Sequence, residues 1–583
     1  MSEQILLKTE KDMPYQPISL GSMEWNKTGT WRYLRPRFDN KISPCNEGCP
    51  AGQDVEGAMV LIGKGKTLEA WELFKEENPF PAVCGRVCYH PCESSCNRGE
   101  FDEAVSINGL ERFMADIASR QGRKPTWVKR EKRKEKIAII GSGPAGLTCA
   151  YHLARMSYGV TVFEALPVLG GMLRVGIPEY RLPKKVLEEE IDQILELGVK
   201  AEMNVRFGKG MLLNDLKEYQ AVFLAMGNHR SKTLGVPGED TDGVMSGVEF
   251  LRKVSLGQEI TLSKRVAVIG GGNTAIDAAR TALRLGAKPF IVYRRTKEEM
   301  PAFPAEILEA EEEGIEISFL VSPVQVIAEN GRVSRLECVK NRLGPPDEDG
   351  RRRPVEIKGS NFFLEVDEMI TAVGEEADLS VLPKKIGIKD NTILTDERGA
   401  TKQKGFFAGG DIIQQPRTVV HAIGSGKRAA IFIDCLLQKK NWEGLFDTIR
   451  IGERGNLSMK RYLQEENQRV PLSSKTVRLK DLNLDYFDYK KRPKMPKAPL
   501  AKRLGSFGEV NLGFSEEVAV EAANRCFNCG ICNLCDNCYI FCPDVAIRKE
   551  EGRNVVDYDH CKGCGICVEE CPRDAMVMEE EGR

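Results

Sequence analysis

Cysteine spacing constrains this chain more than any other feature of its sequence. Ten of the nineteen cysteines lie between Cys526 and Cys571, and six more lie between Cys45 and Cys96. The C-terminal group contains the run C-x2-C-x2-C-x3-C-P twice, formed by Cys532, Cys535, Cys538 and Cys542, then by Cys561, Cys564, Cys567 and Cys571. This spacing is typical of ligands to four-iron clusters, and the fourth cysteine of each run binds the other cluster. The sequence therefore predicts two [4Fe-4S] clusters here.

The first of these runs has a competing register. Cys526, Cys529 and Cys532 also satisfy C-x2-C-x2-C. We favour the register that starts at Cys532, because its last two cysteines and the following proline reproduce the end of the motif. Cys526 and Cys529 are then thiols outside the two runs, or ligands to another site. A zinc site built from four of the ten cysteines is the alternative to the clusters.

Length and charge exclude several classes of protein. A chain of 583 residues is long enough for about three to five domains. The net charge of −1 provides no general attraction to nucleic acid or to an anionic membrane. The opening residues are polar, and no apolar run approaches the roughly eighteen residues of a membrane span. We expect a cytoplasmic protein, where short-spaced cysteine pairs bind metals more often than they form disulfides.

A first dinucleotide-binding fingerprint follows the N-terminal group of cysteines. An apolar strand at 137–140 leads into Gly141, Gly143 and Gly146, and a helical stretch comes next. Such glycines allow a tight turn and a close approach to a pyrophosphate, which then faces the N-terminus of the helix. Glu164 ends the second predicted strand, where a carboxylate can hold a ribose hydroxyl.

A second fingerprint follows the strand at 266–269. Its candidate cofactor contacts are Gly270, Gly272, Asn273 and Ala275. The next strand, 290–293, is followed by Arg294 and Arg295, so that an arginine stands where the first fingerprint has Glu164. A guanidinium pairs with a 2′-phosphate, whereas a carboxylate would repel it. The pattern favours NADPH over NADH, and the alternative is a solvated strand end.

Two further segments indicate that the first site binds FAD. The segment 406–412 is an apolar strand that ends in glycines, and its Gly410 and Asp411 can approach a flavin and its ribityl hydroxyls. Gly170 is a further candidate contact. With Gly374 and its neighbours, these residues resemble the two-dinucleotide-binding flavoproteins, in which the NAD(P) domain is inserted into the FAD domain. That resemblance implies direct hydride transfer between nicotinamide and flavin, for which we assign no acid–base residue. Cys149, Cys338 and Cys435 are solitary and are interpreted as structural.

The predicted fold class is α/β, with two Rossmann-like domains between a helical iron–sulfur domain and a bacterial-ferredoxin-like α+β domain. The predicted plan is an iron–sulfur domain at 1–130, a first FAD part at 131–250, an NAD(P) domain at 251–364, a second FAD part at 365–440, a linker at 441–515 and a ferredoxin-like domain at 516–583.

The N-terminal cysteines resemble one particular iron–sulfur domain. The segments 44–57 and 80–96 and the helix from Ile107 are similar to the domain shared by the glutamate synthase small subunit, dihydropyrimidine dehydrogenase and the large subunit of NADH-dependent ferredoxin:NADP oxidoreductase. The resemblance implies one cluster bound by Cys49, Cys88, Cys92 and Glu111. A carboxylate is a harder ligand than a thiolate and tunes the potential of the cluster.

The second cluster of that domain is incomplete in this chain. Relatives carry a C-x2-C pair where this chain has Arg37 and Asn40, which do not bind iron. Cys45 and Cys96 remain, with Cys84 nearby. The cluster is therefore absent, rebuilt with Cys84 and another ligand, or shared with a partner subunit.

Together these features predict an oxygen-sensitive, FAD-dependent NAD(P)H oxidoreductase. It would pass electrons between NAD(P)H and low-potential iron–sulfur acceptors, either ferredoxin or a partner subunit of a hetero-oligomeric complex. The alternatives are a glutamate synthase small subunit, an electron-bifurcating module, and a non-enzymatic iron–sulfur carrier. We expect no nucleic-acid partner.

Overall fold

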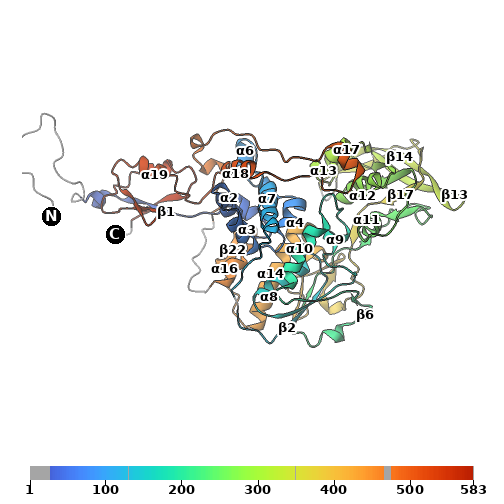
Figure 1. Ribbon diagram of the computed structural model, residues 1–583, viewed down its shortest axis with the longest axis horizontal. Coiled ribbons are helices and arrows are strands. Elements are labelled where there is room, and N and C mark those ends of the chain that lie inside the picture. The colour runs from blue at the N-terminus through green and yellow to red at the C-terminus, as the bar shows by residue number, and fades with distance from the viewer. Residues whose placement is uncertain (1–26, 129, 348–349, 465–474, 582–583) are drawn as a thin grey trace, which may run out of the picture. The chain divides into compact units, whose positions relative to one another are not determined.

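The computed structural model describes residues 27–128, 130–347, 350–464 and 475–581 (Figure 1). These residues form two compact units. Among the described residues, the larger unit consists of 45–464, with the gaps given above, and 491–526. The smaller unit consists of 27–44, 475–490 and 527–581. Each unit is built from segments that are far apart in the sequence.

The first dinucleotide fold of the larger unit is a five-stranded parallel sheet in the order β21-β7-β2-β3-β4. Its strands are β2 (Lys136–Ile140), β3 (Gly159–Phe163), β4 (Lys200–Glu202), β7 (Ala221–Leu224) and β21 (Phe406–Ala408). The three central strands are buried along nearly their whole length, as expected for a parallel sheet covered on both faces. Helices α8 (Pro144–Arg155) and α14 (Val419–Leu437) pack against each other beside it. Smaller elements of this region are α9 (Met172–Val175), α10 (Lys184–Leu195), β5 (Arg206–Phe207), β6 (Gly210–Met211), β8 (Arg230–Ser231), β18 (Glu375–Glu376), β19 (Ile388–Lys389) and β20 (Thr392–Ile393).

The second dinucleotide fold is also a five-stranded parallel sheet, in the order β12-β11-β10-β17-β9. Its strands are β9 (Val244–Ser246), β10 (Arg265–Ile269), β11 (Lys288–Tyr293), β12 (Glu316–Phe319) and β17 (Glu368–Thr371). Its helices are α11 (Gly247–Ser255), α12 (Asn273–Arg284) and α13 (Pro304–Glu312). Because β9 and β17 pair within this sheet, the fold extends beyond the predicted limits 251 and 364 on both sides. An antiparallel sheet extends from it, made of β13 (Val321–Glu329), β14 (Arg332–Pro346), β15 (Arg352–Glu356) and β16 (Phe362–Glu365).

Short helices form the N-terminal part of the larger unit, as predicted. They are α2 (Val55–Gly63), α3 (Thr67–Lys75), α4 (Pro81–Val87), α5 (Pro91–Ser94), α6 (Arg98–Phe101) and α7 (Ile107–Arg120), after α1 (Pro44–Gly48). The Asp54 side chain begins α2 by accepting from the backbone N–H of Gly57 at 3.1 Å. Trp71, Phe74, Phe80 and Leu110 are buried in a core that continues into the first dinucleotide fold.

The predicted linker at 441–515 is not one extended tether. Its first part forms α15 (Leu445–Ile449), β22 (Arg450–Ile451), β23 (Asn456–Leu457) and α16 (Met459–Leu463). Ile449 and Met459 are fully buried in the core of the larger unit. A later part forms α17 (Leu500–Gly505), where Lys497 lies 3.0 Å from Glu309 and Arg503 lies 2.8 Å from Glu312 of α13. The linker prediction rested on composition, but a polar, proline-rich segment can also be held in place by ion pairs to a neighbouring element.

The smaller unit contains a ferredoxin-like arrangement of short elements. They are the hairpin β24 (Ile547–Glu550) and β25 (Arg553–Val556), helices α19 (Asn537–Ile540) and α20 (Ile566–Glu569), and the antiparallel pair β1 (Leu34–Phe38) and β26 (Met576–Glu580). Two predicted boundaries differ. The N-terminal strand β1 belongs to this unit because it pairs with β26, and α18 (Glu516–Asn524) belongs to the larger unit because Ala519 and Ala522 are buried in that unit's core, where α18 packs on α2.

Candidate functional site

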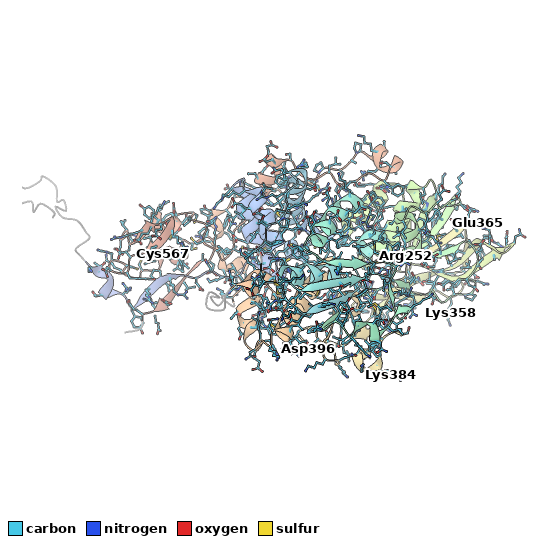
Figure 2. All side chains as sticks on the ribbon, turned by 60° about the horizontal axis from the view of Figure 1, so that its bottom comes forward. Arg252, Lys358, Glu365, Lys384, Asp396 and Cys567 are labelled. Atoms are coloured by element: carbon cyan, nitrogen blue, oxygen red, sulfur yellow. The ribbon has the colours of Figure 1, made fainter. Side chains whose placement is uncertain are left out.

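A cavity of about 570 Å³ opens between the two dinucleotide folds of the larger unit. The first fold contributes Gly143, Glu164 and Asp411 to its walls, and the second contributes Asn273, Asp277 and Phe303. Arg252, on α11, also lines it and is labelled in Figure 2. Tyr89, from the helical N-terminal part, completes the wall. Three parts of the unit therefore meet at one cavity.

The loop between β2 and α8 is shaped to receive a phosphate group. Gly141 has φ +106°, and a Cβ added to it would lie 2.4 Å from the Ala225 carbonyl oxygen. A Cβ on Gly146 would lie 1.9 Å from the Gly141 oxygen. Gly143, at the N-terminus of α8, faces open space, with no heavy atom within 4 Å of an added Cβ. The two outer glycines thus let the turn close, and the middle one leaves room for a ligand.

Glu164 is held rigidly at the end of β3. One of its carboxylate oxygens accepts from the backbone N–H of Ser142 at 2.9 Å and from its hydroxyl at 2.6 Å. The other oxygen accepts from the backbone N–H of Leu166 at 2.8 Å. A carboxylate offers about four acceptor positions, so capacity is left for a ribose hydroxyl at the cavity wall.

Gly410 and Asp411 form another side of the cavity. The N–H of Gly410, at φ +73°, donates to the Ser425 hydroxyl of α14 at 2.9 Å. Burial raises the pKa of Asp411 to about 6, while Arg417 opposes this and Glu375 adds to it. A half-buried carboxylate at the cavity wall can accept hydrogen bonds from ligand hydroxyl groups.

Three predicted residues of the flavin site, Gly146, Gly170 and Gly374, lie outside the cavity lining. The N–H of Gly170 donates to the Ser142 hydroxyl at 3.1 Å, so this glycine supports the phosphate loop from behind. Its neighbour Gly171 lines the cavity instead, and a Cβ on it would lie 2.8 Å from the Gly143 Cα. The carbonyl of Gly374 accepts from the Lys232 N–H at 2.9 Å in a chain crossing. The sequence analysis named Gly170, whereas its neighbour Gly171 is the glycine that lines the cavity.

The second fingerprint repeats the geometry of the first. Gly270 has φ +143°, and its added Cβ would lie 2.2 Å from the Ala372 oxygen. Gly272 precedes α12, and a Cβ added to it would meet only Pro301 Cγ, at 4.0 Å. Ala275 is fully buried. The Asn273 side-chain oxygen accepts from the Phe303 N–H at 3.0 Å, which joins the starts of α12 and α13 at the cavity wall.

The two arginines after β11 have different environments. Arg295 is buried, donates to the Arg352 carbonyl at 2.7 Å and pairs with Asp347 at 2.5 Å. These contacts join Arg295, one of the predicted cofactor residues, to the β14–β15 hairpin. Arg294 is exposed, and partial burial together with the positive charges of Arg295 and Arg351 lowers its pKa. Positive charges grouped in this way favour the binding of an anion near Arg294.

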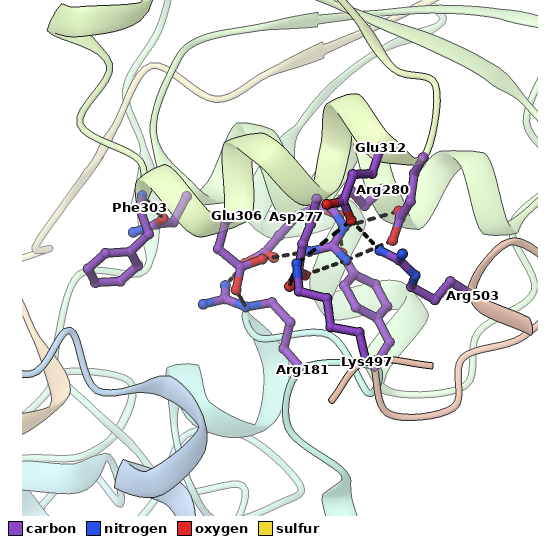
Figure 3. A network of polar contacts seen from close by, with 12 residues as sticks. Arg181, Asp277, Arg280, Phe303, Glu306, Glu312, Lys497 and Arg503 are labelled. Carbon is purple, nitrogen blue, oxygen red and sulfur yellow. Dashed lines mark hydrogen bonds and ion pairs between the residues drawn. The ribbon is translucent and has the colours of Figure 1, made fainter. Parts of the chain in front are cut away.

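A buried charge network joins the two dinucleotide folds (Figure 3). Arg181 pairs with Asp277 of α12 at 2.7 Å and with Glu306 of α13 at 2.9 Å. Arg280 pairs with Glu306, Glu309 and Glu313, and Figure 3 shows Lys497 and Arg503 approaching the other end of this network. Arg181 and Asp277 also line the cavity, and no sequence pattern had singled out either residue.

Tyr89 joins the N-terminal helices to the cavity. Its ring stacks on Phe303 at a centroid distance of 6.2 Å and on His421 of α14 at 6.1 Å. It follows Cys88 directly in the sequence. Sequence reasoning missed Tyr89, although its position next to a candidate ligand was a usable signal.

The four predicted ligands of the N-terminal cluster gather in the larger unit. Cys49 donates to the Gln53 side-chain oxygen at 3.3 Å, and the Gln53 amide donates to a Glu111 oxygen at 3.1 Å. Burial raises the pKa of Cys88 and Cys92, and the charges of Cys49 and Glu111 add to this at both thiols. Burial also raises the pKa of Glu111 to about 8. A buried set of three thiols and one carboxyl, neutral when no cation is near, fits a cluster that supplies positive charge. Gln53 was missed, although it lies four residues after Cys49.

Cys84 belongs with this first group. Its sulfur accepts from the Asn78 amide at 3.5 Å, and the charges of Glu111 and Cys88 act on it. Cys45 and Cys96 are part of the same core. The suggestion that Cys84 completes a second cluster therefore gains no support from its position.

In the smaller unit, the fourth cysteine of each C-terminal run lies near cysteines of the other run. Burial raises the pKa of Cys571, and the charges of Cys535 and Cys532 from the other run add to this. Burial likewise raises the pKa of Cys567, with contributions from Cys561, Cys538, Cys564 and Cys542. The backbone N–H groups of Ala546 and Ala575 donate to the sulfurs of Cys542 and Cys571 at 3.2 and 3.3 Å. This arrangement supports the register that starts at Cys532. Within the described ranges, no three His, Cys, Asp or Glu side chains lie close enough to hold a single metal ion.

Comparison with known proteins assigns the family. The profile of the pyridine nucleotide-disulphide oxidoreductases matches residues 135–426, half of the chain. The chain belongs to this family. Profiles described as dihydropyrimidine dehydrogenase domain II with a 4Fe-4S cluster and as a 4Fe-4S binding domain match residues 39–123 and 554–577.

Three curated relatives of this pyridine nucleotide-disulphide oxidoreductase are especially similar. The NADP(+)-dependent formate dehydrogenase subunit beta of Moorella thermoacetica is 40% identical over 84% of this chain and 70% of its own length. The NADPH-Fe(3+) oxidoreductase subunit beta of Geobacter sulfurreducens is 39% identical over 84% of this chain and 76% of its own. The glutamate synthase [NADPH] small chain of Escherichia coli is 36% identical over 66% of this chain and 87% of its own.

The protein is therefore an NAD(P)H-dependent oxidoreductase that uses FAD and carries [4Fe-4S] clusters in its N-terminal and C-terminal parts. The cavity and the cysteine groups provide residues that fit each of these groups. None of the helices described by the structure is long and apolar enough to cross a membrane.

Proposed function

We propose that this chain is the NADPH-oxidising subunit of a hetero-oligomeric oxidoreductase and delivers electrons to iron–sulfur acceptors. The observation that carries the proposal is the single cavity to which both dinucleotide folds and Tyr89 contribute. Oxidation of one NADPH releases two electrons as a hydride, and iron–sulfur acceptors take one electron each.

Different residues around the cavity would bind the two dinucleotide cofactors. The open Gly143 loop would hold a pyrophosphate, and Glu164 and Asp411 would accept from hydroxyl groups of the same cofactor. Asn273 and the α12 N-terminus would hold the second dinucleotide, with Arg294 at its 2′-phosphate. FAD, when bound, supplies the exchange between a hydride and single electrons. The protein contributes positioning and exclusion of water.

Electrons that leave the cavity would pass to a cluster at the N-terminal cysteines. Tyr89 lines the cavity, and its neighbour Cys88 belongs to the proposed ligand set with Cys49, Cys92 and Glu111. The carboxyl ligand would be held in place by Gln53. This arrangement puts a candidate acceptor next to the wall of the cavity.

A partner subunit is supported by the surface of the smaller unit. Helix α19 and its flanks expose Tyr539, Ile540, Phe541 and Val545, with exposed fractions of 40, 67, 50 and 70%. Large apolar side chains that gather on a surface indicate an interaction site. Two of the relatives are named as beta subunits. We propose that a partner subunit docks here and carries the chemistry on the final substrate.

The test is anaerobic. The holoprotein should be reduced by NADPH at the flavin and the clusters, and should pass two electrons per NADPH to a one-electron dye. Tagged protein from its native host should co-purify with a second subunit in a fixed ratio, and Ile540→Asp should release that subunit while dye reduction persists. Failure of NADPH to reduce the holoprotein would overturn the oxidoreductase proposal, and a subunit-free preparation would overturn the partner.

A glutamate synthase small subunit is the second candidate, because the chain matches 87% of the length of such a relative. The match spans only 66% of this chain. A co-purifying large subunit that forms glutamate from glutamine and 2-oxoglutarate would establish this candidate. A partner without that activity would exclude it.

A further inference from the structure

The segment 496–512 of the larger unit forms a closed loop. The backbone of 496–498 pairs antiparallel with that of 510–512, through hydrogen bonds of 2.8 and 2.9 Å. Helix α17 lies between these two paired ends. Because the ends are bonded to each other, the segment is a structural unit and not a loose connection. It is called the clamp loop below.

One side of the clamp loop is bonded to the N-terminal helices. Its Glu509 carboxylate pairs with Arg86 of α4 at 2.8 Å and with Arg112 of α7 at 3.0 Å. Both arginine side chains are 5% exposed, so solvent and salt screen these pairs little. Directly after the loop, the Phe514 ring lies so close to Gly109 of α7 that an added Cβ would be 2.3 Å from it.

The clamp loop is also bonded to the first dinucleotide fold, at Tyr180. The Val510 N–H donates to the Tyr180 carbonyl at 3.0 Å, and the Phe507 ring lies 6.5 Å from the tyrosine ring. Tyr180 is fully buried, and its hydroxyl donates to the Asp277 carbonyl of α12 at 3.2 Å. The loop is therefore fixed on the first fold at a point where that fold meets the second.

The other side of the clamp loop binds to α13 of the second dinucleotide fold (Figure 3). Lys497 pairs with Glu309 at 3.0 Å, and Arg503 pairs with Glu312 at 2.8 Å. Glu309 is 3% exposed and pairs with Arg280 of α12 as well, at 2.9 Å. The loop thus joins the second fold to the two parts of the unit on which it is itself anchored.

The covalent connection between the dinucleotide folds is short and does not fix their orientation by itself. The chain crosses between them twice, and the crossings pair as β8 with β18 over two residue pairs. A two-stranded ribbon is marginally stable alone, and short connections of this kind act as hinges. The orientation of the second fold therefore depends on side-chain contacts, which include those of Arg181 and of the clamp loop.

We propose that the clamp loop holds the second dinucleotide fold in the orientation that hydride transfer requires, with Lys497, Arg503 and Glu509 as positioning residues. The described lining of the cavity includes none of the three, so they act through α13, which begins after the cavity residue Phe303. Reacting atoms must lie about 3–3.5 Å apart, and a misplacement of about 1 Å can cost about 100-fold in rate. The inference rests on the proposed function, because it concerns transfer from NADPH in that cavity.

The first test measures flavin reduction by NADPH in the full-length holoprotein, without oxygen and with rapid mixing. The double variant Lys497→Ala, Arg503→Ala should lower the limiting rate at saturating NADPH about tenfold or more. A role in cofactor binding alone would be overcome at saturation. Lys497→Arg with Arg503→Lys keeps both charges and should restore most of the rate. Lys502→Ala, which removes an exposed side chain of α17, should leave the rate unchanged.

The second test needs no NADPH. In the oxidised holoprotein, the Lys232 N–H donates to the Gly374 carbonyl at 2.9 Å beside the β8–β18 ribbon. Its hydrogen exchange should become several-fold faster in the double alanine variant, because the ribbon bends when the second fold moves. Glu509→Gln loosens the other side of the loop and should change rate and exchange in the same direction, whereas the exposed Glu516→Gln should change neither.

Combining Glu509→Gln with the double alanine variant should slow flavin reduction little further, because all three residues act through one loop. Wild-type rate and wild-type exchange in the double alanine variant would overturn the proposal, and so would fully additive losses in the combination. Full FAD content shows that a variant has folded. If the double alanine variant lacks FAD, Lys497→Gln is measured in its place and the same results decide. A wild-type flavin that NADPH does not reduce would overturn the proposed function, and hydrogen exchange would then still decide whether the loop holds the second fold.

Discussion

The ring of Tyr89 lies nearly parallel to the imidazole of His421, with centroids 6.1 Å and planes 15° apart. Phe303 stacks on Tyr89 at 6.2 Å, so one tyrosine joins the N-terminal helices to both dinucleotide folds at the cavity wall. Tyr89→Ala should open this wall and admit oxygen, and should raise oxygen-dependent NADPH oxidation several-fold relative to dye reduction. Tyr89→Phe keeps the stacking and should behave as the wild type. The comparison is made with an oxygen electrode, and equal oxidase rates in all three proteins would refute a closing role.

Arg294 should set the preference for NADPH. Its guanidinium is exposed among positive charges, and Arg295 is occupied by Asp347. A charge-assisted bond is worth about 1.5–3 kcal/mol, so Arg294→Ala should raise the KM for NADPH about 10- to 100-fold and leave NADH unaffected. Arg353→Ala removes an exposed arginine of the same domain and serves as the control. Unchanged KM values for both cofactors would place the 2′-phosphate elsewhere.

Arg181 should fix the second dinucleotide fold on the first. Arg181→Ala leaves the buried Asp277 without its nearest partner, and removal of one partner from a buried pair costs about 3–5 kcal/mol. The free energy of unfolding should fall by that amount, and the KM for NADPH should rise because α12 and α13 lose their anchor. The double variant with Asp277→Asn should recover much of the lost free energy of unfolding, but its KM for NADPH should stay raised. If the double variant is no more stable than the single one, the pair does not act as described.

Glu77 should be essential for the fold of the segment predicted as a linker. Its carboxylate pairs with Lys427 at 2.6 Å and accepts from the Met459 N–H at 2.7 Å and the Ser458 hydroxyl at 2.5 Å. Glu77→Ala leaves the Lys427 ammonium buried and should lower the free energy of unfolding by about 3–5 kcal/mol. Glu69→Ala breaks the exposed Lys66 pair and should change it by less than about 1 kcal/mol. Urea denaturation separates the two, and similar losses would contradict the assignment.

Asp411 should make the FAD-free protein less stable as pH rises. Burial raises the pKa of Asp411 from 3.8 to about 6, so the folded state favours the protonated carboxyl. Its contribution is full below pH 4 and is lost as pH rises through 6. Asp411→Asn cannot titrate, so its stability relative to the wild type should increase between pH 4 and 7. The exposed Asp396→Asn should show no such trend, and a flat difference for Asp411→Asn would refute the shift.

Much of this protein could be read from short-range patterns. The phosphate loops at Gly141 and Gly270 and the C-terminal cysteine runs are local motifs, because a turn and adjacent cluster ligands are set by residues a few positions apart. The same applies to the strands at 136–140 and 265–269, whose apolar runs require burial on both faces. Glu111 was proposed as a ligand only because the helix from Ile107 resembles known iron–sulfur domains.

The remaining features depend on contacts between distant segments. The sequence could not distinguish Arg294 from Arg295, because only the position of Asp347 shows which guanidinium is occupied. The contacts of Glu77 and Glu309 with the segment predicted as a linker, 441–515, could not be foreseen, because both residues lie far from it in the sequence. The sequence determined which chemical groups this protein can hold, because ligand spacing is local. Only the tertiary structure decided which residues meet to hold them, because burial and ion pairing act between segments that folding brings together.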